Sequence, residues 1–326
     1  MLTNFAKTHI GQRTTNEDCI LVDEELGLYI VADGVGGLEK GEVASKMACE
    51  KVLECTKEGR KLDYSVYEAH GALVDQIEGN HSKKGMATTM AAVLFKDNKY
   101  QVSWVGDTRV YLWDGKLKLL TKDDSYVEKL FEHGLIGVED MDTHPDRNVI
   151  SQALGMTRKE VTINNNSGTL ERNQVLLICS DGLYSIANEA YIISELSLQE
   201  GMTHLTEKLV NIAVGNDGKD NISLISIKCD KNTEQEDEII KPHVVREFEA
   251  KTGKVKKHVL DSDSEEIDPN LVDLTDLRDL TVQEKNLIES AALKVPVDKE
   301  KTTNNMVPLA LFAIIVLVAI LLYFLR

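Results

Sequence analysis

The chain has 326 residues, 42% of them hydrophobic, which is enough for one large domain or two small ones. Its 54 acidic residues outnumber its 37 basic residues and give a net charge of −17, which argues against nucleic acid or an anionic membrane surface as an electrostatic partner. The five cysteines are widely spaced and form no C-x-x-C pair, so we expect free thiols rather than a zinc knuckle or a disulfide framework.

Residues 1–230 alternate between patterns typical of strands and of helices. Short apolar runs at 29–32 and 175–179 predict buried strands, and residues 101–105 and 110–113 predict a further strand pair. Between Gly41 and Glu58 the apolar residues recur with helical spacing, which predicts an amphipathic helix. The first residues contain no apolar segment of the kind that a secretory signal needs, so we expect the catalytic part to be cytoplasmic.

The composition changes near residue 230. Residues 231–305 are charged and poor in aromatic residues, which predicts a mostly disordered linker of 75 residues. Residues 306–325 form an uncharged apolar run followed by Arg326. A helix of about 20 apolar residues spans the hydrocarbon core of a bilayer, so we expect a single C-terminal transmembrane helix.

Several aspartates directly follow apolar strands in the sequence. Asp33 and Asp181 are each followed by a glycine, Asp107 follows Trp104-Val-Gly, and Asp220 precedes a strand-like run at 222–227. A strand end fixes the position of a side chain, and an adjacent glycine lets backbone approach closely. Hard divalent cations such as Mg²⁺ and Mn²⁺ prefer carboxylate, carbonyl and water oxygens. Although a single Asp-Gly more often marks only a turn, four aspartates placed at strand ends predict a cation centre.

These aspartates belong to six short motifs, which follow one another along the chain as Gly11-Gln-Arg-Thr-Thr-Asn-Glu-Asp18, Val31-Ala-Asp-Gly-Val-Gly-Gly37, Val105-Gly-Asp-Thr-Arg-Val-Tyr111, Leu120-Thr-Lys-Asp-Asp-Ser125, Ser180-Asp-Gly-Leu183 and Asp220-Asn-Ile-Ser223. The set and its order resemble those of the type 2C metal-dependent Ser/Thr protein phosphatases. The segment 145–155 is similar to the stretch that closes the flap in bacterial-type members of that family.

The resemblance implies an α+β fold over residues 1–230, a four-layer sandwich of two antiparallel β-sheets flanked by α-helices. It also implies a site for two Mn²⁺ or Mg²⁺ ions and a third, weaker ion. Some eukaryotic members have a histidine, a proposed general acid, where this chain has Val35. By position in the motifs, Asp33 would bridge both ions, and the Gly34 carbonyl would join one of them. Asp181 and Asp220 would complete the other ion's ligands, whereas Glu17 and Asp18 would act through waters. Asp107 would match the third ion, and Arg13 would hold the substrate phosphate.

The resemblance implies a phosphatase that hydrolyses phosphoserine and phosphothreonine by a metal-activated water, and the apolar run at 306–325 predicts that it is membrane-anchored. We expect its partners to be phosphoproteins near the membrane, where it would counter a Ser/Thr kinase. The acidic net charge predicts that nucleic acid is not a partner. The alternative is a membrane-tethered pseudophosphatase that binds phosphoproteins without cleaving them. Degenerate members of that kind are expected to lose metal carboxylates, whereas Asp33, Asp181 and Asp220 are all present.

Overall fold

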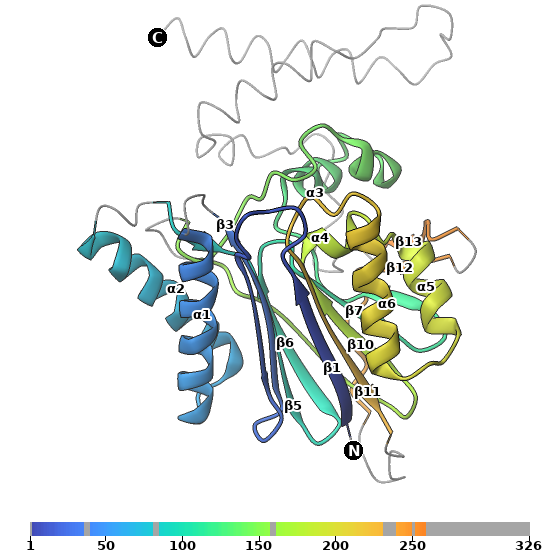
Figure 1. Cartoon of the computed structure of the whole chain (residues 1–326), viewed down its shortest axis with the longest axis horizontal. Helices are drawn as coiled ribbons and strands as arrows, with labels where there is room; N and C mark the ends of the chain where they lie inside the picture. Colours follow the sequence, from blue (N-terminus) through green and yellow to red (C-terminus); the bar gives the residue numbers. More distant parts are fainter. Residues whose placement is uncertain are drawn as a thin grey trace, which may run out of the picture. The chain divides into compact units, whose positions relative to one another are not determined.

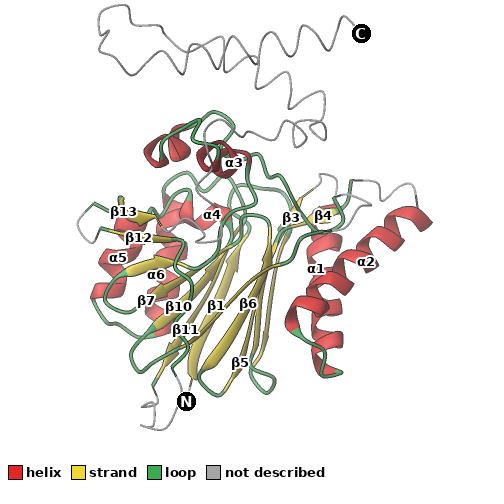
Figure 2. Cartoon of the chain, turned by 180° about the vertical axis from the view of Figure 1, so that it is seen from behind, coloured by secondary structure: helices red, strands yellow, loops and turns green. Residues whose placement is uncertain are grey.

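The computed structural model describes residues 2–35, 40–80, 85–156, 161–230, 239–249 and 252–258. In this part of the chain two antiparallel β-sheets stack face to face, and helices cover the outer face of each sheet (Figure 1, Figure 2). This arrangement confirms the predicted sandwich of two antiparallel sheets flanked by helices.

Within the described residues, each sheet gathers strands from distant parts of the sequence. The first sheet has the order β1 (Leu2–His9), β11 (Ile222–Cys229), β10 (Val175–Cys179), β7 (Arg109–Trp113), β8 (Leu117–Leu119), β12 (Arg246–Phe248) and β13 (Val255–His258). The second has the order β2 (Asp18–Asp23), β3 (Leu28–Val35), β5 (Met90–Lys96), β6 (Lys99–Val105) and β9 (Asn164–Thr169), and the short β4 (Ala87–Thr88) also pairs with β3.

The helices divide between the two sheets and a flap above them. Against the second sheet lie α1 (Lys40–Lys57) and α2 (Leu62–Gly79); against the first lie α4 (Asp181–Tyr184), α5 (Glu189–Ser197) and α6 (Met202–Gly215). We use the term flap for residues 120–156, which contain α3 (Tyr126–Glu132) and the 3₁₀ helix η2 (Val138–Thr143). The predicted helix is α1, whose buried Ala44, Ala48, Val52 and Cys55 share one face.

Strand β10 shows why the layers form. Val175, Leu177 and Cys179 face the helices α5 and α6, whereas Leu176 and Ile178 face the other sheet. Because side chains alternate across a strand, a strand that is apolar at every position needs cover on both faces. The sandwich supplies that cover, with one apolar core between the sheets and one under each helical layer.

One predicted strand pair is wrong. Residues 101–105 and 110–113 do form strands, but β6 lies in the second sheet and β7 in the first. Gly106 between them has φ +97°, and a Cβ there would lie 2.5 Å from the Thr89 side chain. The chain therefore crosses from one sheet to the other at a position that only glycine accommodates easily.

The predicted linker boundary at residue 230 is also wrong for part of the segment that follows it. We use the term C-terminal extension for the described residues 239–249 and 252–258, which add β12 and β13 to the edge of the first sheet. Phe248 is buried and joins the core under α5 and α6. The remainder of the predicted linker, and the predicted span at 306–325, lie outside the described residues.

Ending the chain at residue 230 should destabilise the folded unit, because it removes β12 and the buried Phe248. Burial of one such side chain contributes about 1.5–3 kcal/mol. For a domain of this size we expect the melting temperature to fall by about 5–10 °C relative to a chain that ends at Ser262. Thermal unfolding of the two truncated proteins measures the difference, and equal melting temperatures would show that the extension adds no stability.

Among the described helices, none combines the length and the apolar character that crossing a bilayer requires.

Candidate active site

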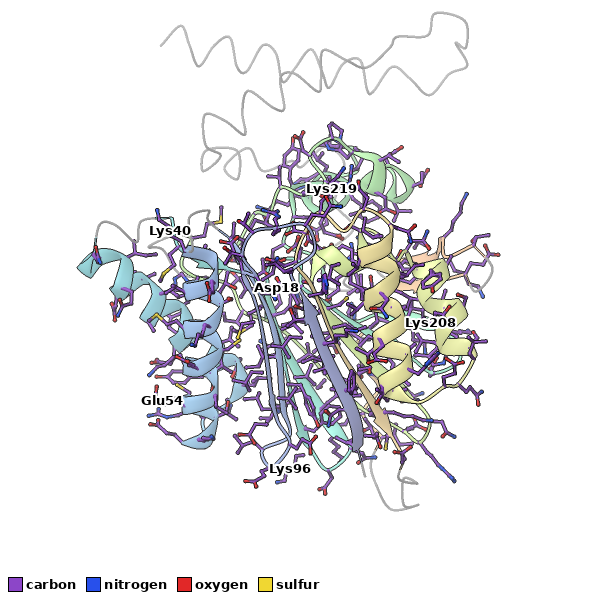
Figure 3. All side chains as sticks on the ribbon, viewed as in Figure 1. Asp18, Lys40, Glu54, Lys96, Lys208 and Lys219 are labelled. Atoms are coloured by element: carbon purple, nitrogen blue, oxygen red, sulfur yellow. The ribbon has the colours of Figure 1, made fainter. Side chains whose placement is uncertain are left out.

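Two neighbouring strands place the first pair of carboxylates. Asp18 begins β2, Asp33 lies near the end of β3, and the two are direct partners in the antiparallel register. The Asp33 carbonyl accepts hydrogen bonds from the Thr88 hydroxyl and the Thr89 amide, both at 2.8 Å. Asp18 is buried toward one end of the sheets, and Lys96 at the end of β5 marks the opposite end (Figure 3).

The first sheet brings Asp181 to the same end of the sandwich. Strand β10 ends at Cys179, and Asp181 starts the short helix α4. The Ser180 hydroxyl donates to Asp18 Oδ2 at 2.9 Å and accepts from the Ser223 amide at 3.0 Å. Ser180 therefore joins the two sheets directly beneath the carboxylates.

Asp220 reaches the site from the loop before β11. Arg13 donates to Asp220 Oδ2 at 2.7 Å, and the two side chains are 52% and 38% exposed. A Cβ at Gly11, which has φ +61°, would lie 1.9 Å from the Asp220 carbonyl, and one at Gly182 would lie 2.0 Å from the Asn221 carbonyl. Glycine at both positions thus allows three loops to meet.

Asn221 fixes the loop that carries Arg13, Glu17 and Asp18. Its side-chain amide donates to the carbonyls of Ile10 at 2.9 Å and Thr15 at 3.0 Å, and its Oδ1 accepts from the Glu17 amide at 2.7 Å. One side chain therefore satisfies three backbone groups of a single loop.

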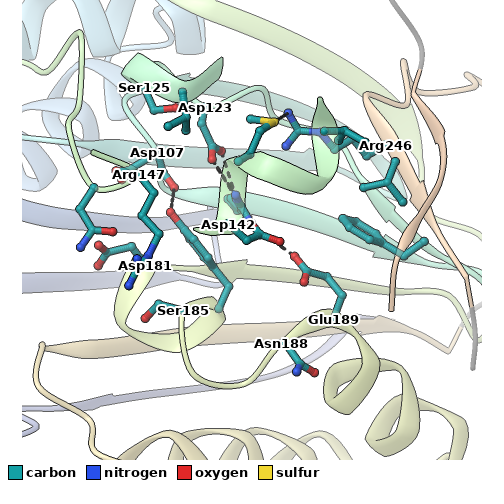
Figure 4. Close-up of a pocket in the computed structure, with 18 residues that line it drawn as sticks. Asp107, Asp123, Ser125, Asp142, Arg147, Asp181, Ser185, Asn188, Glu189 and Arg246 are labelled. Atoms are coloured by element: carbon teal, nitrogen blue, oxygen red, sulfur yellow. Dashed lines mark hydrogen bonds and ion pairs between the residues drawn. The ribbon is translucent and has the colours of Figure 1, made fainter. Parts of the chain in front are cut away.

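Asp107 follows the crossover at Gly106 and is buried. The Gly106 amide donates to Asp124 Oδ2 at 2.8 Å, and the Tyr184 hydroxyl donates to the Asp107 carbonyl at 3.0 Å. Figure 4 shows Asp107 and Asp181 at the same end of a pocket. The structure therefore brings the proposed position for a third ion beside the principal carboxylates.

The electrostatics show that these carboxylates share one space. Burial raises the pKa of Asp33 well above its ordinary value, and the charges of Asp18, Asp181, Asp107 and Asp220 raise it further. Burial also raises the pKa of Asp18 to about 7 and that of Asp181 to about 6. Like charges gathered in a buried place raise one another's pKa values, and a divalent cation removes that cost.

Two buried oxygens fit a cation as their missing partner. Among the described residues, Asp18 Oδ1 and Asp181 Oδ1 are buried with no hydrogen-bond partner. No group of three or more His, Cys, Asp or Glu side chains in the described residues is arranged to hold one ion by itself. Mg²⁺ typically takes only one or two carboxylates and keeps several waters. The site therefore fits hydrated Mg²⁺ or Mn²⁺ rather than an ion held in a cage of protein side chains.

Glu17, Gly34 and Val35 border the carboxylates. The Gly34 amide donates to the Glu17 carbonyl at 3.1 Å. A Cβ at Gly41 would lie 2.7 Å from the Gly34 carbonyl and 2.8 Å from Glu17 Oε1, which places both oxygens at the start of α1. Val35 is exposed at the end of β3. All eight residues predicted for the site therefore lie on the loops, the strand ends and the start of α4 at this end of the sandwich.

A buried ion network beside the site was not predicted from the sequence. Arg109 donates to Asp123 Oδ2 at 2.7 Å and to Glu189 Oε1 at 3.2 Å, and its guanidinium lies 3.8 Å from the centre of the Tyr184 ring. Figure 4 shows Asp123 and Glu189 joined through this network. Arg109 and Asp123 lie within two of the recognised motifs, which is the only sequence signal that could have indicated them.

The raised pKa values predict how pH affects stability. A carboxyl whose pKa is higher in the folded protein than its ordinary 3.8 favours folding at low pH, and this contribution disappears as pH rises through about 6 to 7 for Asp181 and Asp18. Because a cation needs the ionised forms, Mn²⁺ should raise the melting temperature more at about pH 8 than at about pH 5.5. Thermal unfolding in Mn²⁺ and in EDTA measures this, and an equal increment at both pH values would contradict it.

Fold and site together define a class of protein: a layered α+β domain with a carboxylate site for divalent cations at one end of its two sheets. A family model described as protein phosphatase 2C matches residues 6–223. The chain therefore belongs to the protein phosphatase 2C family, whose members are metal-dependent Ser/Thr phosphatases.

Individual relatives agree with the family assignment. The chain is 32% identical over 220 residues to the serine/threonine protein phosphatase PstP of Mycobacterium tuberculosis, covering 65% of this chain and 42% of that protein. It is 30% identical over 214 residues to the serine/threonine phosphatase Stp of Listeria monocytogenes, covering 62% of this chain and 84% of that protein. The chain thus spans less than half the length of PstP.

The solved structure of one relative contains metal ions. The catalytic domain of PstP, in complex with two manganese ions, is similar to this chain with a TM-score of 0.61 and 29% identity. The similarity covers 70% of this chain and 97% of that domain. Two-ion occupancy is thus recorded for a relative with the same fold.

Proposed function

We propose that this chain is a protein serine/threonine phosphatase that hydrolyses phosphoserine and phosphothreonine at a site for two Mn²⁺ or Mg²⁺ ions. The observation that carries the proposal is the gathering of Asp18, Asp33, Asp107 and Asp181 in one largely buried place at the end of both sheets. A pseudophosphatase has no need to keep this electrostatically costly cluster, so catalysis is the better account of it. When bound, two such ions supply an acidified water and a clamp for in-line phosphoryl displacement.

Different residues of the site would hold the ions and the substrate. Asp33 would hold both ions, with the Gly34 carbonyl beside it, and Asp181 and Asp220 would complete the set. Glu17 and Asp18 would act through waters, and Asp107 would serve a weaker third position. Each assignment is supported by the placement of the residue at one end of the sandwich.

Arg13 is proposed to bind the substrate phosphate. Its guanidinium is half exposed and lies beside Asp220, at the border between solvent and the carboxylates. The forked donors of arginine match phosphate oxygens, and an exposed side chain can turn toward an incoming ester. Binding rather than chemistry should therefore depend on Arg13.

Metal removal tests the proposal. The full chain should release phosphate from phosphoserine and phosphothreonine peptides in Mn²⁺ or Mg²⁺, and EDTA should abolish turnover until excess metal is restored. The reason is that the site offers only hard oxygen ligands. Full turnover in EDTA by protein shown to be metal-free would contradict the two-ion mechanism, and no turnover in any divalent metal would favour the pseudophosphatase.

We propose further that residues 306–325 anchor the protein in a membrane with the catalytic domain on the cytoplasmic side. The support is the uncharged apolar run and the basic Lys294, Lys299 and Lys301 upstream of it. Substrates would then be phosphoproteins near that membrane, made by a Ser/Thr kinase that this enzyme counters. Deletion of 306–326 should move active enzyme from the membrane fraction to the soluble fraction, and an unchanged distribution would contradict the anchor.

A further inference from the structure

The C-terminal extension contacts the flap through a buried ion pair. Arg246 in β12 donates to Glu128 in α3, and the two side chains are only 5% and 2% exposed. Arg246 also lies 3.5 Å from the sulfur of Met141 in η2. One side chain of the extension therefore touches both helical segments of the flap.

The extension is itself tied to both sheets. The Val245 amide donates to the Leu119 carbonyl at 2.9 Å in the first sheet. At the second sheet, Asn166 donates to the His243 carbonyl at 2.8 Å, and the Thr169 amide donates to the Ile240 carbonyl at 2.8 Å. Arg246 thus links the flap to a strand that is fixed at several points, which makes it a rigid support.

The flap, the extension and residues 181–189 of α4 and α5 line a pocket of about 320 Å³ that begins at Asp107 and Asp181 (Figure 4). This volume falls in the range of ligand sites and exceeds what a phosphate group needs. Its walls include apolar side chains from the flap, such as Val138 and Met141, and from the extension, Phe248 and Val255. Charged side chains line it as well, Arg246 among them. Such a pocket suits the residues that flank a phosphorylated side chain in a protein substrate.

The family model ends at residue 223, before the extension begins. We propose that Arg246 is a positioning residue that holds the flap against the pocket. The residues that flank the phosphorylated side chain of a phosphoprotein occupy this pocket, so Arg246 sets the affinity for phosphoproteins. The turnover of small phosphate esters does not depend on it. The proposal rests on the phosphatase function proposed above. It adds a contribution to substrate recognition from a segment outside the family match.

Replacing Arg246 tests the proposal through two substrates. In the full chain with saturating Mn²⁺, Arg246→Met should raise KM for a phosphothreonine peptide about tenfold, because removal of one partner disrupts a buried ion pair. For 4-nitrophenyl phosphate, which has no flanking residues to occupy the pocket, kcat and KM should stay within about twofold. Arg246→Lys keeps the charge but loses the planar guanidinium fork, so its peptide KM should lie between those of the wild type and of Arg246→Met.

Two further variants separate an effect on peptide KM from unfolding of the protein and from a general effect of removing charge. Glu128→Gln combined with Arg246→Met leaves no unpaired buried charge, and it should show the same rise in peptide KM with wild-type thermal unfolding. Lys256→Ala removes an exposed cation from β13, 3.9 Å from Glu247, and should match wild type on both substrates.

The outcomes separate this inference from the proposed function. A folded single or double variant with wild-type peptide KM would overturn the role of Arg246. An equal loss on both substrates would overturn it too, since the effect would then reach the metal carboxylates. A wild-type chain inactive on both substrates in Mn²⁺ would overturn the phosphatase function itself, and the inference with it.

Discussion

Alanine at Asp181 or Asp33 should nearly abolish turnover. Asp181 Oδ1 is buried with no hydrogen-bond partner among the described residues, and the charge of Asp181 adds to the effect of burial in raising the pKa of Asp33. A residue that merely supports a metal ligand costs about 10- to 100-fold when replaced, so loss of a ligand itself should cost about a thousandfold or more in kcat. The measurement is kcat for 4-nitrophenyl phosphate over a Mn²⁺ titration, with protein concentration fixed.

A matched control separates this loss from a general charge effect. Asp63→Ala removes an exposed carboxylate at the start of α2, whose Oδ1 accepts from the Tyr64 amide, and it should leave kcat unchanged. Asp181→Asn keeps the size of the side chain while removing its charge, and it should be nearly as inactive as the alanine variant. If Asp181→Ala turned over at the wild-type rate across the titration, the ligand assignment would be wrong.

The charged residues of the site could be predicted from the sequence, but most of what holds them could not. An aspartate between an apolar strand and a glycine is a local signal, and Asp33 and Asp181 both carry it. Ser180, by contrast, acts by bonding Asp18, which is distant in sequence. Asp124 likewise gains its role only through contact with Gly106 across the crossover. Both residues lie in the recognised motifs, but their contacts can be identified only in the folded structure.

The same distinction applies to the fold. Strand β10 was predicted with correct bounds because five consecutive apolar residues mark a strand buried on both faces. Strand β12 has only three residues, Arg246-Glu-Phe248, in a charged stretch. Its place depends on backbone hydrogen bonds to β8 and on the ion pair with Glu128, neither of which leaves a periodic apolar pattern. A segment can therefore contribute to a core even though its composition is mostly charged.

Asn221→Ala should lower kcat/KM by about 10- to 100-fold, although Asn221 is not assigned to any ion. Its side chain makes three hydrogen bonds to the backbone of the loop that carries Arg13, Glu17 and Asp18. Without these hydrogen bonds the loop loses its fixed position, so the affinity for Mn²⁺ should fall and the KM for substrate should rise. Steady-state kinetics at several Mn²⁺ concentrations measures each effect separately.

Two companion variants show which part of Asn221 matters. Asn221→Asp has the same size and can still accept from the Glu17 amide, but it cannot donate to the carbonyls of Ile10 and Thr15. It should therefore be as impaired as the alanine variant, because two of the three bonds are lost and a further carboxylate joins the cluster. Asn211→Ala, on the exposed face of α6, should match wild type. A wild-type kcat/KM for Asn221→Ala at low Mn²⁺ would show that the loop is held without this side chain.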